Sequence, residues 1–541
     1  MIQIKIKTKF FPHYERYKIK IKKTPKRGKS KRIILISDSH ITRGQIFNYE
    51  IFKKAITEIQ TIKNIDYIIH LGDLTHKGTY LEYLYALDCI KPINKDNFYI
   101  IPGNHDAKNV GYLIFEEMFG SRGFEFEDES LFVLGFDSSV PDLNSGRIGK
   151  RGIEKLKRIF LNMEEKTKIF CFHHQLLPIP LTGRERSTII DSGDVLKMIL
   201  SSKIDIIVNG HRHITNCYSC TNGLNEFIIF NSGNLSCNKT RYKELFSYSI
   251  MDVFEKAVNF TTKKLMSNEI IERGRYINRV FNVKSPKSDK KLIFKAVNIS
   301  NTHFSRNFYN EEIYNKAIEQ INKMDLDIVI HTGDVTNNNL IDEYDIAVQK
   351  LDLIKKDKII IPGGHDLENI GWDLFPAKIG PLEPYFETDK VRIMGINSLD
   401  YSIINGIVGR RKTSEIVDFL KNEPNQKINI ILLYHNLIPH PRTRNIKMLS
   451  DSGNILKFFT EPENKIHFIL TGHDHISFTL QVEDTILTSS GTISSTELLN
   501  LKGNTYNVIS CYDNGFVEID EVAVENNMYR RIGEYWINFS N

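Results

Sequence analysis

The chain has 541 residues, of which 41% are hydrophobic and 26% are charged, an ordinary balance for a globular protein. This length exceeds one ordinary hydrophobic core, so we expect at least two domains. The sequence has no apolar run long enough for a membrane helix, and its Lys-rich N-terminus does not resemble a secretory signal. Six cysteines are too few for a disulfide framework. We therefore expect a cytoplasmic protein that does not contact a membrane.

The net charge of +6 is unevenly distributed along the chain. Residues 1–32 hold ten Lys, three Arg and one Glu, which sum to +12, so the remainder sums to −6. A basic arm of this kind can contact nucleic acid. Ile and Lys also alternate in this segment, which predicts a β-hairpin with its Lys side chains in water. We favour the hairpin, because no aromatic platform for bases accompanies the charge.

Short apolar segments rich in β-branched residues recur after the basic arm. They span residues 33–37, 67–71, 98–101, 169–172 and 204–208. Such segments are typical of strands that are buried on both faces. Apolar residues at helical spacing, as in residues 51–62, lie between some of them. Alternating strands and helices predict an α/β sheet.

Each of these apolar segments ends in polar residues. The polar clusters are Asp38-Ser39-His40, Gly72-Asp73, Gly103-Asn104-His105-Asp106, His173-His174 and Gly210-His211-Arg212-His213. We expect them to gather at one edge of the sheet, where α/β proteins hold ligands.

The polar clusters supply carboxylate, amide and imidazole groups that suit metal ions. The candidate ligands are Asp38, His40, Asp73, Asn104, His174, His211 and His213. This mixture fits borderline ions such as Mn, Fe or Zn, and the lack of a thiolate disfavours a structural zinc site. Seven ligands are too many for one tetrahedral ion with an open position. They suit two ions that share a carboxylate and together bind a phosphoryl group.

The same motifs return about 261 residues later. HLGD at His70 returns as HTGD at His331, IIPGNHD returns as IIPGGHD ending at Asp366, and NGHRH returns as TGHDH ending at His475. Chance similarity would not keep this register over the whole chain. We predict tandem domains spanning residues 1–265 and 266–541.

The motif order D-x-H, GD, GNHD, H and GHxH resembles that of the calcineurin-like metallophosphoesterases. The resemblance implies an α/β fold of two tandem domains, each a layered α/β/β/α sandwich. It implies two divalent or trivalent ions bridged by Asp73, with a bridging hydroxide that attacks phosphorus. The first ion would bind Asp38, His40, Asp73 and His213, and the second would bind Asp73, Asn104, His174 and His211.

The resemblance also implies roles for two residues beside the ligands. His105 would contact the phosphate and help the leaving oxygen depart, and Asp106 would lie behind it. Of the adjacent pair His173 and His174, we choose His174 as the ligand, because the second copy keeps a histidine at its counterpart, position 435.

Loop motifs such as GDLTHKGTYLEY narrow the resemblance to the class III cyclic nucleotide phosphodiesterases. A phosphodiesterase is therefore expected more than a monoesterase, with a nucleotide or cyclic nucleotide as substrate. Gln175-Leu176 replaces prolines that are usual in that group, which weakens the substrate assignment. A metal-dependent nuclease acting on DNA or RNA and a non-catalytic scaffold are the alternatives.

The second copy departs from the ligand pattern. Asp38 is replaced by Asn301 and Asn104 by Gly364. The copy retains His303, Asp334, His435, His473 and His475. A weak or single-ion site is one interpretation of this set. We favour a degenerate, catalytically silent domain that packs against the first copy as the partner subunit of a pseudo-dimer.

Overall fold

The computed structural model describes residues 30–537, except residues 94, 164, 183–187, 243, 256, 277–289, 401–405, 422–426, 444–447 and 499–502. The predicted basic hairpin lies almost entirely outside these residues. The chain forms two compact units. The first extends beyond the predicted boundary at residue 265, because strand β12 (Ile270–Tyr276) pairs along strand β11 (Ala257–Lys264).

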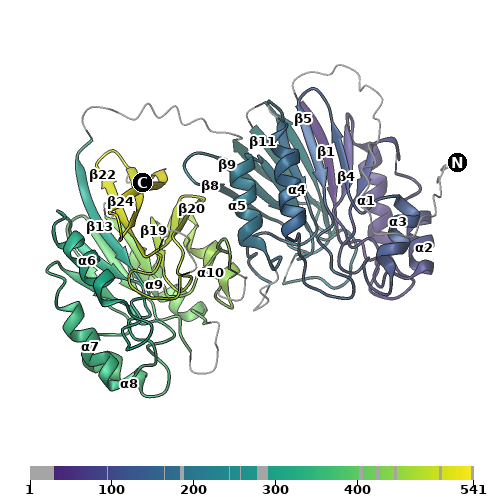
Figure 1. The fold of residues 1–541 in the computed structure, drawn as a ribbon. Coiled ribbons are helices and arrows are strands. Elements are labelled where there is room, and N and C mark those ends of the chain that lie inside the picture. Colours follow the sequence, from purple (N-terminus) through teal and green to yellow (C-terminus); the bar gives the residue numbers. More distant parts are fainter. Residues whose placement is uncertain are drawn as a thin grey trace. The chain divides into compact units, whose positions relative to one another are not determined.

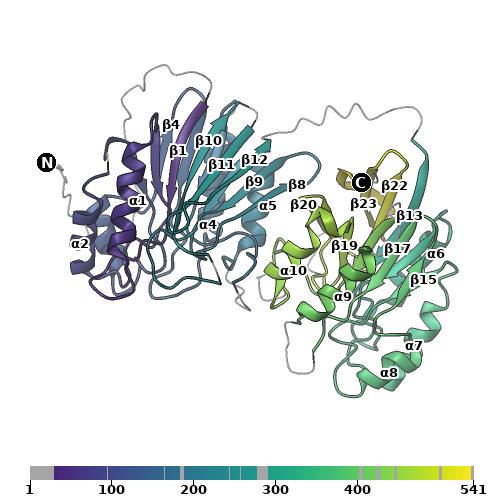
Figure 2. The same ribbon diagram turned by 180° about the vertical axis from the view of Figure 1, so that it is seen from behind.

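The described strands of the first unit form one six-stranded sheet and contribute six neighbouring strands to a second sheet (Figures 1 and 2). One has the order β12, β11, β10 (Ser247–Phe254), β1 (Ser30–Ile36), β2 (Tyr67–His70) and β3 (Phe98–Ile100). The other has the order β4 (Phe124–Glu127), β5 (Leu131–Gly135), β6 (Thr167–Cys171), β7 (Ile206–Asn209), β9 (Glu226–Asn231) and β8 (Asn216–Thr221). The strands that precede the polar motifs are parallel within each sheet.

The two sheets pack face to face, and helices cover their outer faces. Ile33 and Leu35 of β1 lie in the core between the sheets, whereas Ile34 and Ile36 face a second core beneath helices. This alternation is the period of two of a strand that is buried on both sides. Helices α1 (Tyr49–Thr61), α2 (Tyr80–Ile90) and α3 (Gly111–Phe119) cover the β1 sheet, and α4 (Lys150–Leu161) and α5 (Ser192–Ser202) cover the other.

The second unit repeats this arrangement. One of its sheets has the order β15 (Lys358–Ile360), β14 (Ile328–His331), β13 (Leu292–Ile299), β22 (Thr505–Tyr512), β23 (Phe516–Ala523) and β24 (Met528–Trp536). In the other sheet the strands of this unit have the order β16 (Tyr385–Glu387), β17 (Val391–Gly395), β18 (Ile428–Leu432), β19 (Phe468–Thr471), β21 (Thr485–Ser489) and β20 (Phe478–Val482). Its helices are α6 (Glu311–Asn322), α7 (Ile341–Leu351), α8 (Gly371–Lys378), α9 (Arg410–Lys421) and α10 (Ser452–Phe459). The predicted tandem α/β/β/α sandwiches are therefore confirmed.

The structure also bears on two expectations from the composition, one about membranes and one about cysteines. Among the described residues, no helix has both the length and the apolar character needed to cross a membrane. All six cysteines are free thiols, and five of them are buried.

Candidate metal centre

The predicted site residues of the first unit follow the carboxyl ends of strands in both sheets. Asp38 and His40 follow β1, and Asp73 follows β2. Asn104 and His105 follow β3, the pair at 173–174 follows β6, and His211 and His213 follow β7. The strand ends of the two sheets thus converge on one group of side chains, as predicted for the ligand-binding edge of an α/β sheet.

Five of these residues have a left-handed backbone, which L-residues seldom adopt. They are Asp38 (φ 53°), His40 (φ 48°), Asp73 (φ 55°), His211 (φ 73°) and His213 (φ 60°). Each such residue costs about 1–3 kcal/mol unless its surroundings enforce it. Backbone hydrogen bonds enforce it here, since Asp38 N donates to Gly72 O at 3.0 Å and His40 N to Asp73 O at 2.9 Å. The tight turns aim successive side chains at a common centre.

One half of the site is built around Asp38 and His40. Asp38 Oδ1 lies 3.3 Å from His213 Nε2, and His40 Nε2 lies 3.5 Å from Asp73 Oδ2. The buried His40 Nε2 has no hydrogen-bond partner among the described residues. His213 Nδ1 donates to Lys239 O at 2.8 Å, which leaves its Nε2 lone pair for a metal. These groups could hold one metal ion.

The other half of the site contains His173 rather than His174. His173 Nε2 lies 3.3 Å from Asp73 Oδ2 and 3.3 Å from His211 Nδ1. Its Nδ1 donates to Leu71 O at 2.8 Å, so in the neutral ring Nε2 carries the lone pair. His174 Nδ1 instead lies 2.9 Å from Ser138 Oγ. Of the two, His173 is the one whose ligand atom lies beside those of Asp73 and His211. His174 Nε2 is buried and has no hydrogen-bond partner among the described residues, so His174 stays a candidate from the sequence.

The second unit explains why the sequence argument selected His174. His435, the counterpart of His174, has its Nδ1 2.9 Å from Ser398 Oγ, so both units keep the same Ser–His contact. The counterpart of His173 is Tyr434, whose hydroxyl donates to Asp334 Oδ2 at 2.8 Å. The histidine shared by the two copies thus marks a common contact with a serine, while the residue that faces Asp73 or Asp334 differs between them.

Asn104 completes the second half of the site. Its side chain is 1% exposed, and Nδ2 donates to Asn144 Oδ1 at 3.4 Å. Its Oδ1 is buried and has no hydrogen-bond partner within the described part of the chain. A buried amide oxygen without a partner is costly unless a cation or water binds it, so this atom fits a metal ligand.

His105 lies beside the metal-binding residues, and its ring is fixed by the backbone. Its Nδ1 donates to His76 O at 2.7 Å, and its main-chain N donates to Asp73 Oδ1 at 2.8 Å. The ring centroid lies 4.5 Å from that of His40. Gly103, two residues earlier, must lack a side chain, because a Cβ there would lie 2.1 Å from Asp73 Oδ1. Nε2 is the ring atom left to exchange a proton.

The carboxylate of Asp106, which the resemblance places behind His105, is turned towards main-chain N atoms. This buried carboxylate accepts hydrogen bonds from the main-chain N atoms of Leu74, Thr75 and Gly103 at 2.7–3.0 Å. It therefore joins the loop after β2 to the loop after β3. Burial and the nearby Asp73 charge raise the pKa of Asp106 to about 7. Its role is to position the loops that carry Asp73 and His105.

His76 is a site residue that the sequence reasoning missed. Its Nδ1 lies 3.3 Å from His40 Nδ1, and its ring stacks on His105 with centroids 5.0 Å apart. The motif GDLTH contains His76, but the second copy has Asn337 at this position, so the repeat gave no signal. Asn337 Oδ1 nevertheless lies 3.0 Å from His303 Nδ1, which shows that both residues support the same ligand position.

The pKa shifts of Asp38, Asp73, His40 and His211 suit metal binding, whereas that of His173 opposes it. Burial would raise the pKa of Asp38, but His213 lowers it to about 2, and His173 holds the pKa of Asp73 well below its usual range against the effect of burial. Burial lowers the pKa of His40 and that of His211 well below the usual value. Burial would also lower the pKa of His173, but Asp73 raises it to about 9. Metal binding at His173 must therefore release a proton.

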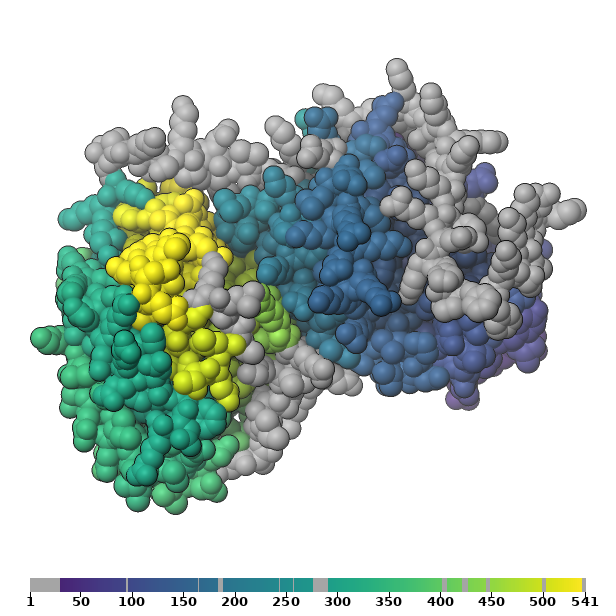
Figure 3. Space-filling model, viewed as in Figure 1, coloured from purple at the N-terminus to yellow at the C-terminus, as the bar shows by residue number. Residues whose placement is uncertain are grey.

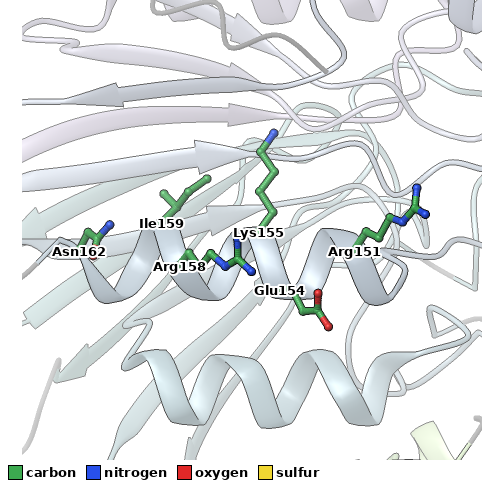
Figure 4. Close-up of a pocket in the computed structure, with 6 residues that line it drawn as sticks. All are labelled: Arg151, Glu154, Lys155, Arg158, Ile159 and Asn162. Atoms are coloured by element: carbon green, nitrogen blue, oxygen red, sulfur yellow. The ribbon is translucent and has the colours of Figure 1, made fainter. Parts of the chain in front are cut away.

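A surface hollow elsewhere in the first unit contains none of these residues. It lies along α4 and is lined by Arg151, Glu154, Lys155, Arg158, Ile159 and Asn162 (Figure 4). In the space-filling view, α4 forms part of the outer surface of this unit (Figure 3). Its lining is one face of a single helix, so it lacks the converging polar groups expected of an active site.

Comparisons with known proteins identify the family to which the chain belongs. The family model described as calcineurin-like phosphoesterase matches residues 31–215 and again residues 295–477, together more than half of the chain. A probable cyclic nucleotide phosphodiesterase of Vesicomyosocius okutanii is 27% identical over 231 residues, which cover 38% of this chain and 97% of that protein. A probable glycerophosphodiester phosphodiesterase of Arcobacter nitrofigilis is 30% identical over 176 residues, which cover 28% of this chain and 64% of that protein.

Among solved structures, a purple acid phosphatase from yellow lupin seeds covers 45% of this chain and 53% of its own, with 15% identity and a TM-score of 0.37. The argument for the family rests on the two matches to its model, one in each unit. These matches confirm the resemblance and the tandem duplication. The chain belongs to the calcineurin-like phosphoesterase family and is a metal-dependent phosphoesterase that contains two copies of the family's domain.

Proposed function

We propose that the first unit hydrolyses small phosphodiesters with two metal ions that share Asp73. One observation carries this proposal. Two ligand clusters, Asp38-His40-Asp73 and Asp73-His173-His211, each place their ligand atoms within 4.8 Å of one another, and Asp73 belongs to both. A carboxylate common to two clusters is what a pair of ions about 3.5–4 Å apart requires.

The donor atoms divide into two sets. Asp38, His40, Asp73 and His213 would hold the first ion, and Asp73, Asn104, His173 and His211 would hold the second. The lone-pair atoms His40 Nε2 and Asn104 Oδ1, which are buried without hydrogen-bond partners, support this division. Mn, Fe and Zn all fit a mixed oxygen and imidazole set. When bound, the ions would lower the pKa of a shared water and offset the charge of the phosphoryl group.

His105 would act on the leaving group. Its Nδ1 is engaged with a carbonyl, so the proton that it can transfer lies on Nε2. Lys108 Nζ lies 3.3 Å from His105 Nδ1 and adds positive charge beside the ring. The protonated ring could bind a phosphate oxygen and then donate to the departing oxygen.

The substrate class follows from the relatives. Those named above are described as phosphodiesterases of cyclic nucleotides or of glycerophosphodiesters. Both substrate types are small diesters, so we infer a small phosphodiester, with a cyclic nucleotide as the first candidate. The basic segment of residues 1–32 keeps a nuclease as the alternative.

The test is a substrate panel on the full chain, stripped of metal and reloaded with Mn²⁺ or Zn²⁺. We expect hydrolysis of bis(p-nitrophenyl) phosphate and 3′,5′-cyclic nucleotides to exceed that of p-nitrophenyl phosphate. Faster hydrolysis of monoesters would overturn the substrate class. Salt-sensitive cleavage of single-stranded DNA or RNA, without turnover of cyclic nucleotides, would establish the nuclease instead.

We also propose that the second copy takes the place of a partner subunit in a pseudo-dimer. We further propose that the protein resides in a reducing cytoplasm. The tandem repeat supports the pseudo-dimer. The six free thiols support the reducing compartment. A chain truncated after residue 276 should then be poorly soluble or poorly active. A truncated first unit that is soluble, monomeric and fully active would show that the second copy is an independent module.

A further inference from the structure

The second unit retains half of the metal-binding geometry. His303, Asp334 and His475 place one ligand atom each within 4.8 Å of one another. They are the counterparts of His40, Asp73 and His213, and the ring pairs match. The centroids of His303 and His475 are 5.1 Å apart, compared with 5.3 Å for His40 and His213.

The two imidazoles of this cluster face each other through their Nε2 atoms. His475 Nδ1 donates to Glu497 O at 2.9 Å, and His303 Nδ1 lies 3.0 Å from Asn337 Oδ1. These contacts place the N–H of each neutral ring on Nδ1 and a lone pair on Nε2. The two Nε2 atoms are only 3.2 Å apart, and Asp334 Oδ2 lies 3.9 Å from His303 Nε2. Two facing lone pairs repel unless a cation or a shared proton lies between them.

Asn301 supplies a further polar group at the position of Asp38. Its backbone N donates to Gly333 O at 3.0 Å and its φ is 54°, so its main chain matches that of Asp38. Its side chain is fully buried, and neither Oδ1 nor Nδ2 has a hydrogen-bond partner among the residues that the structure describes. A buried amide oxygen left without a partner is suited to a metal.

The other half of the site is filled by protein atoms. Tyr434 replaces the imidazole of His173, and its hydroxyl donates to Asp334 Oδ2. A Cβ on Gly364 would lie 3.3 Å from Tyr434 Oη and 3.4 Å from Cε1, so the phenol leaves little room for an asparagine at that position. Gly364 and Tyr434 together therefore leave this half without the ligand atoms that Asn104 and His173 offer in the first unit.

We propose that the second unit binds a single divalent cation through His303 Nε2, His475 Nε2, Asp334 and Asn301 Oδ1. Asp334 is the single carboxylate that would face the cation of the second unit, whereas two carboxylates, Asp38 and Asp73, would face the corresponding cation of the first unit. Binding is therefore weaker and relies on the imidazoles, which favours Zn²⁺ or Co²⁺ over Mg²⁺ or Ca²⁺. The cation stabilises the unit and lacks the partner ion that in-line phosphoryl transfer would use.

The test measures bound metal in the full chain. Protein stripped by a chelator is reloaded with Zn²⁺ alone, desalted and analysed for metal per chain. We expect three equivalents for the wild type and two for His475→Ala. His467→Gln, which changes a histidine of the same unit outside the cluster, should keep three. Thermal unfolding with and without Zn²⁺ would show whether each variant is folded.

A triple variant tests the missing half of the site. Asn301→Asp, Gly364→Asn and Tyr434→His together should raise the content to four equivalents, while Gly364→Asn alone should not. Co²⁺ loading adds a spectroscopic check, because His475→Ala should lose visible absorption in proportion to one ion. Equal metal content in the wild type and His475→Ala would overturn the proposal and leave a shared proton between the rings. A wild type with one equivalent and a His475→Ala variant with none would instead refute the two-metal site of the first unit.

Discussion

The two units carry the same loops around different ligands. Asn301, His303, Asp334, His473 and His475 have the left-handed backbone of their five counterparts in the first unit. The enforcing hydrogen bond is also the same, since Asn301 N donates to Gly333 O at 3.0 Å, as Asp38 N does to Gly72 O. The second unit keeps these costly turns although it lacks the complete ligand set. The turns are therefore maintained by the scaffold, and metal chemistry depends on a few side chains placed upon it.

The aspartate of the GxHD motif shows the same division. Asp366 accepts hydrogen bonds from the main-chain N atoms of Val335, Thr336 and Gly363 at 2.7–3.0 Å, which matches the contacts of Asp106. Burial raises the pKa of Asp366 to about 6, close to the value for Asp106. The two aspartates therefore join the same pair of loops in both units, whether or not the surrounding ligand set is complete.

The largest expected effect is the difference in activity between substitutions of Asp73 and of its counterpart Asp334. Asp73→Asn removes the charge shared by both ions and should lower phosphodiester hydrolysis on the order of a thousandfold or more, because two-metal stabilisation contributes several kcal/mol to the transition state. Asp334→Asn should leave turnover nearly unchanged. Steady-state rates of both variants on one diester measure the difference. Equal losses would mean that the second unit is catalytic despite Asn301 and Gly364.

His105 and His365 form the next matched pair. His105→Ala should lower kcat about a hundredfold to ten-thousandfold, the usual contribution of general acid catalysis, while bound metal stays constant. His365 holds the same main-chain contact, with its Nδ1 2.8 Å from Asn337 O, but lies beside an incomplete site. His365→Ala should have no effect on kcat. Metal loss in proportion to activity loss in His105→Ala would show that the residue acts through binding.

Most of the fold, and the gathering of the candidate ligands at one edge, followed from the sequence, since buried strands ending in Asp, Asn and His predict both the sheet edge and its polar residues. Two assignments could not be made in this way. Adjacent residues after a strand point in different directions, so spacing does not decide between His173 and His174. The role of Asp106 depends on main-chain donors from two loops, which side-chain motifs do not reveal.

The choice between His173 and His174 gives the third comparison. His173→Ala removes a lone pair that faces Asp73 and should lower metal content by about one equivalent, together with most of the activity. His174→Ala breaks a contact with Ser138 that the second unit also has, so its main effect should be on folding stability. Metal analysis and thermal unfolding of both variants separate these outcomes. Loss of an ion from a folded His174→Ala protein would restore the original choice.

A pH effect should be common to both units, because it depends on the scaffold. Burial lowers the pKa of His70 to about 4 and that of His331 to about 3, below about 6.5 in an unfolded chain. Between these values the unfolded chain binds a proton that the folded chain does not. The free energy of unfolding is therefore highest above pH 6.5, and it falls by up to about 3 kcal/mol as the pH drops towards 4. Denaturant titrations at pH 7 and 5 in chelator measure the free energy of unfolding. This free energy should depend less on pH in His70→Gln and in His331→Gln than in the wild type, and an unchanged dependence would contradict this.

The smallest expected effect comes from exchanging the residues that support the first ligand position. His76 Nδ1 contacts His40 Nδ1 in the first unit, and Asn337 Oδ1 contacts His303 Nδ1 in the second. Because an amide oxygen can accept the proton of His40 Nδ1, His76→Asn should preserve the ring orientation and change metal affinity less than tenfold. His76→Ala leaves that nitrogen without its partner and should weaken the first ion about tenfold to a hundredfold, the usual cost of losing such a partner. Titration of stripped protein with Zn²⁺ measures both constants. If the two variants bind equally, the contact between His40 and His76 does not support the metal, and the resemblance between His76 and Asn337 is one of position alone.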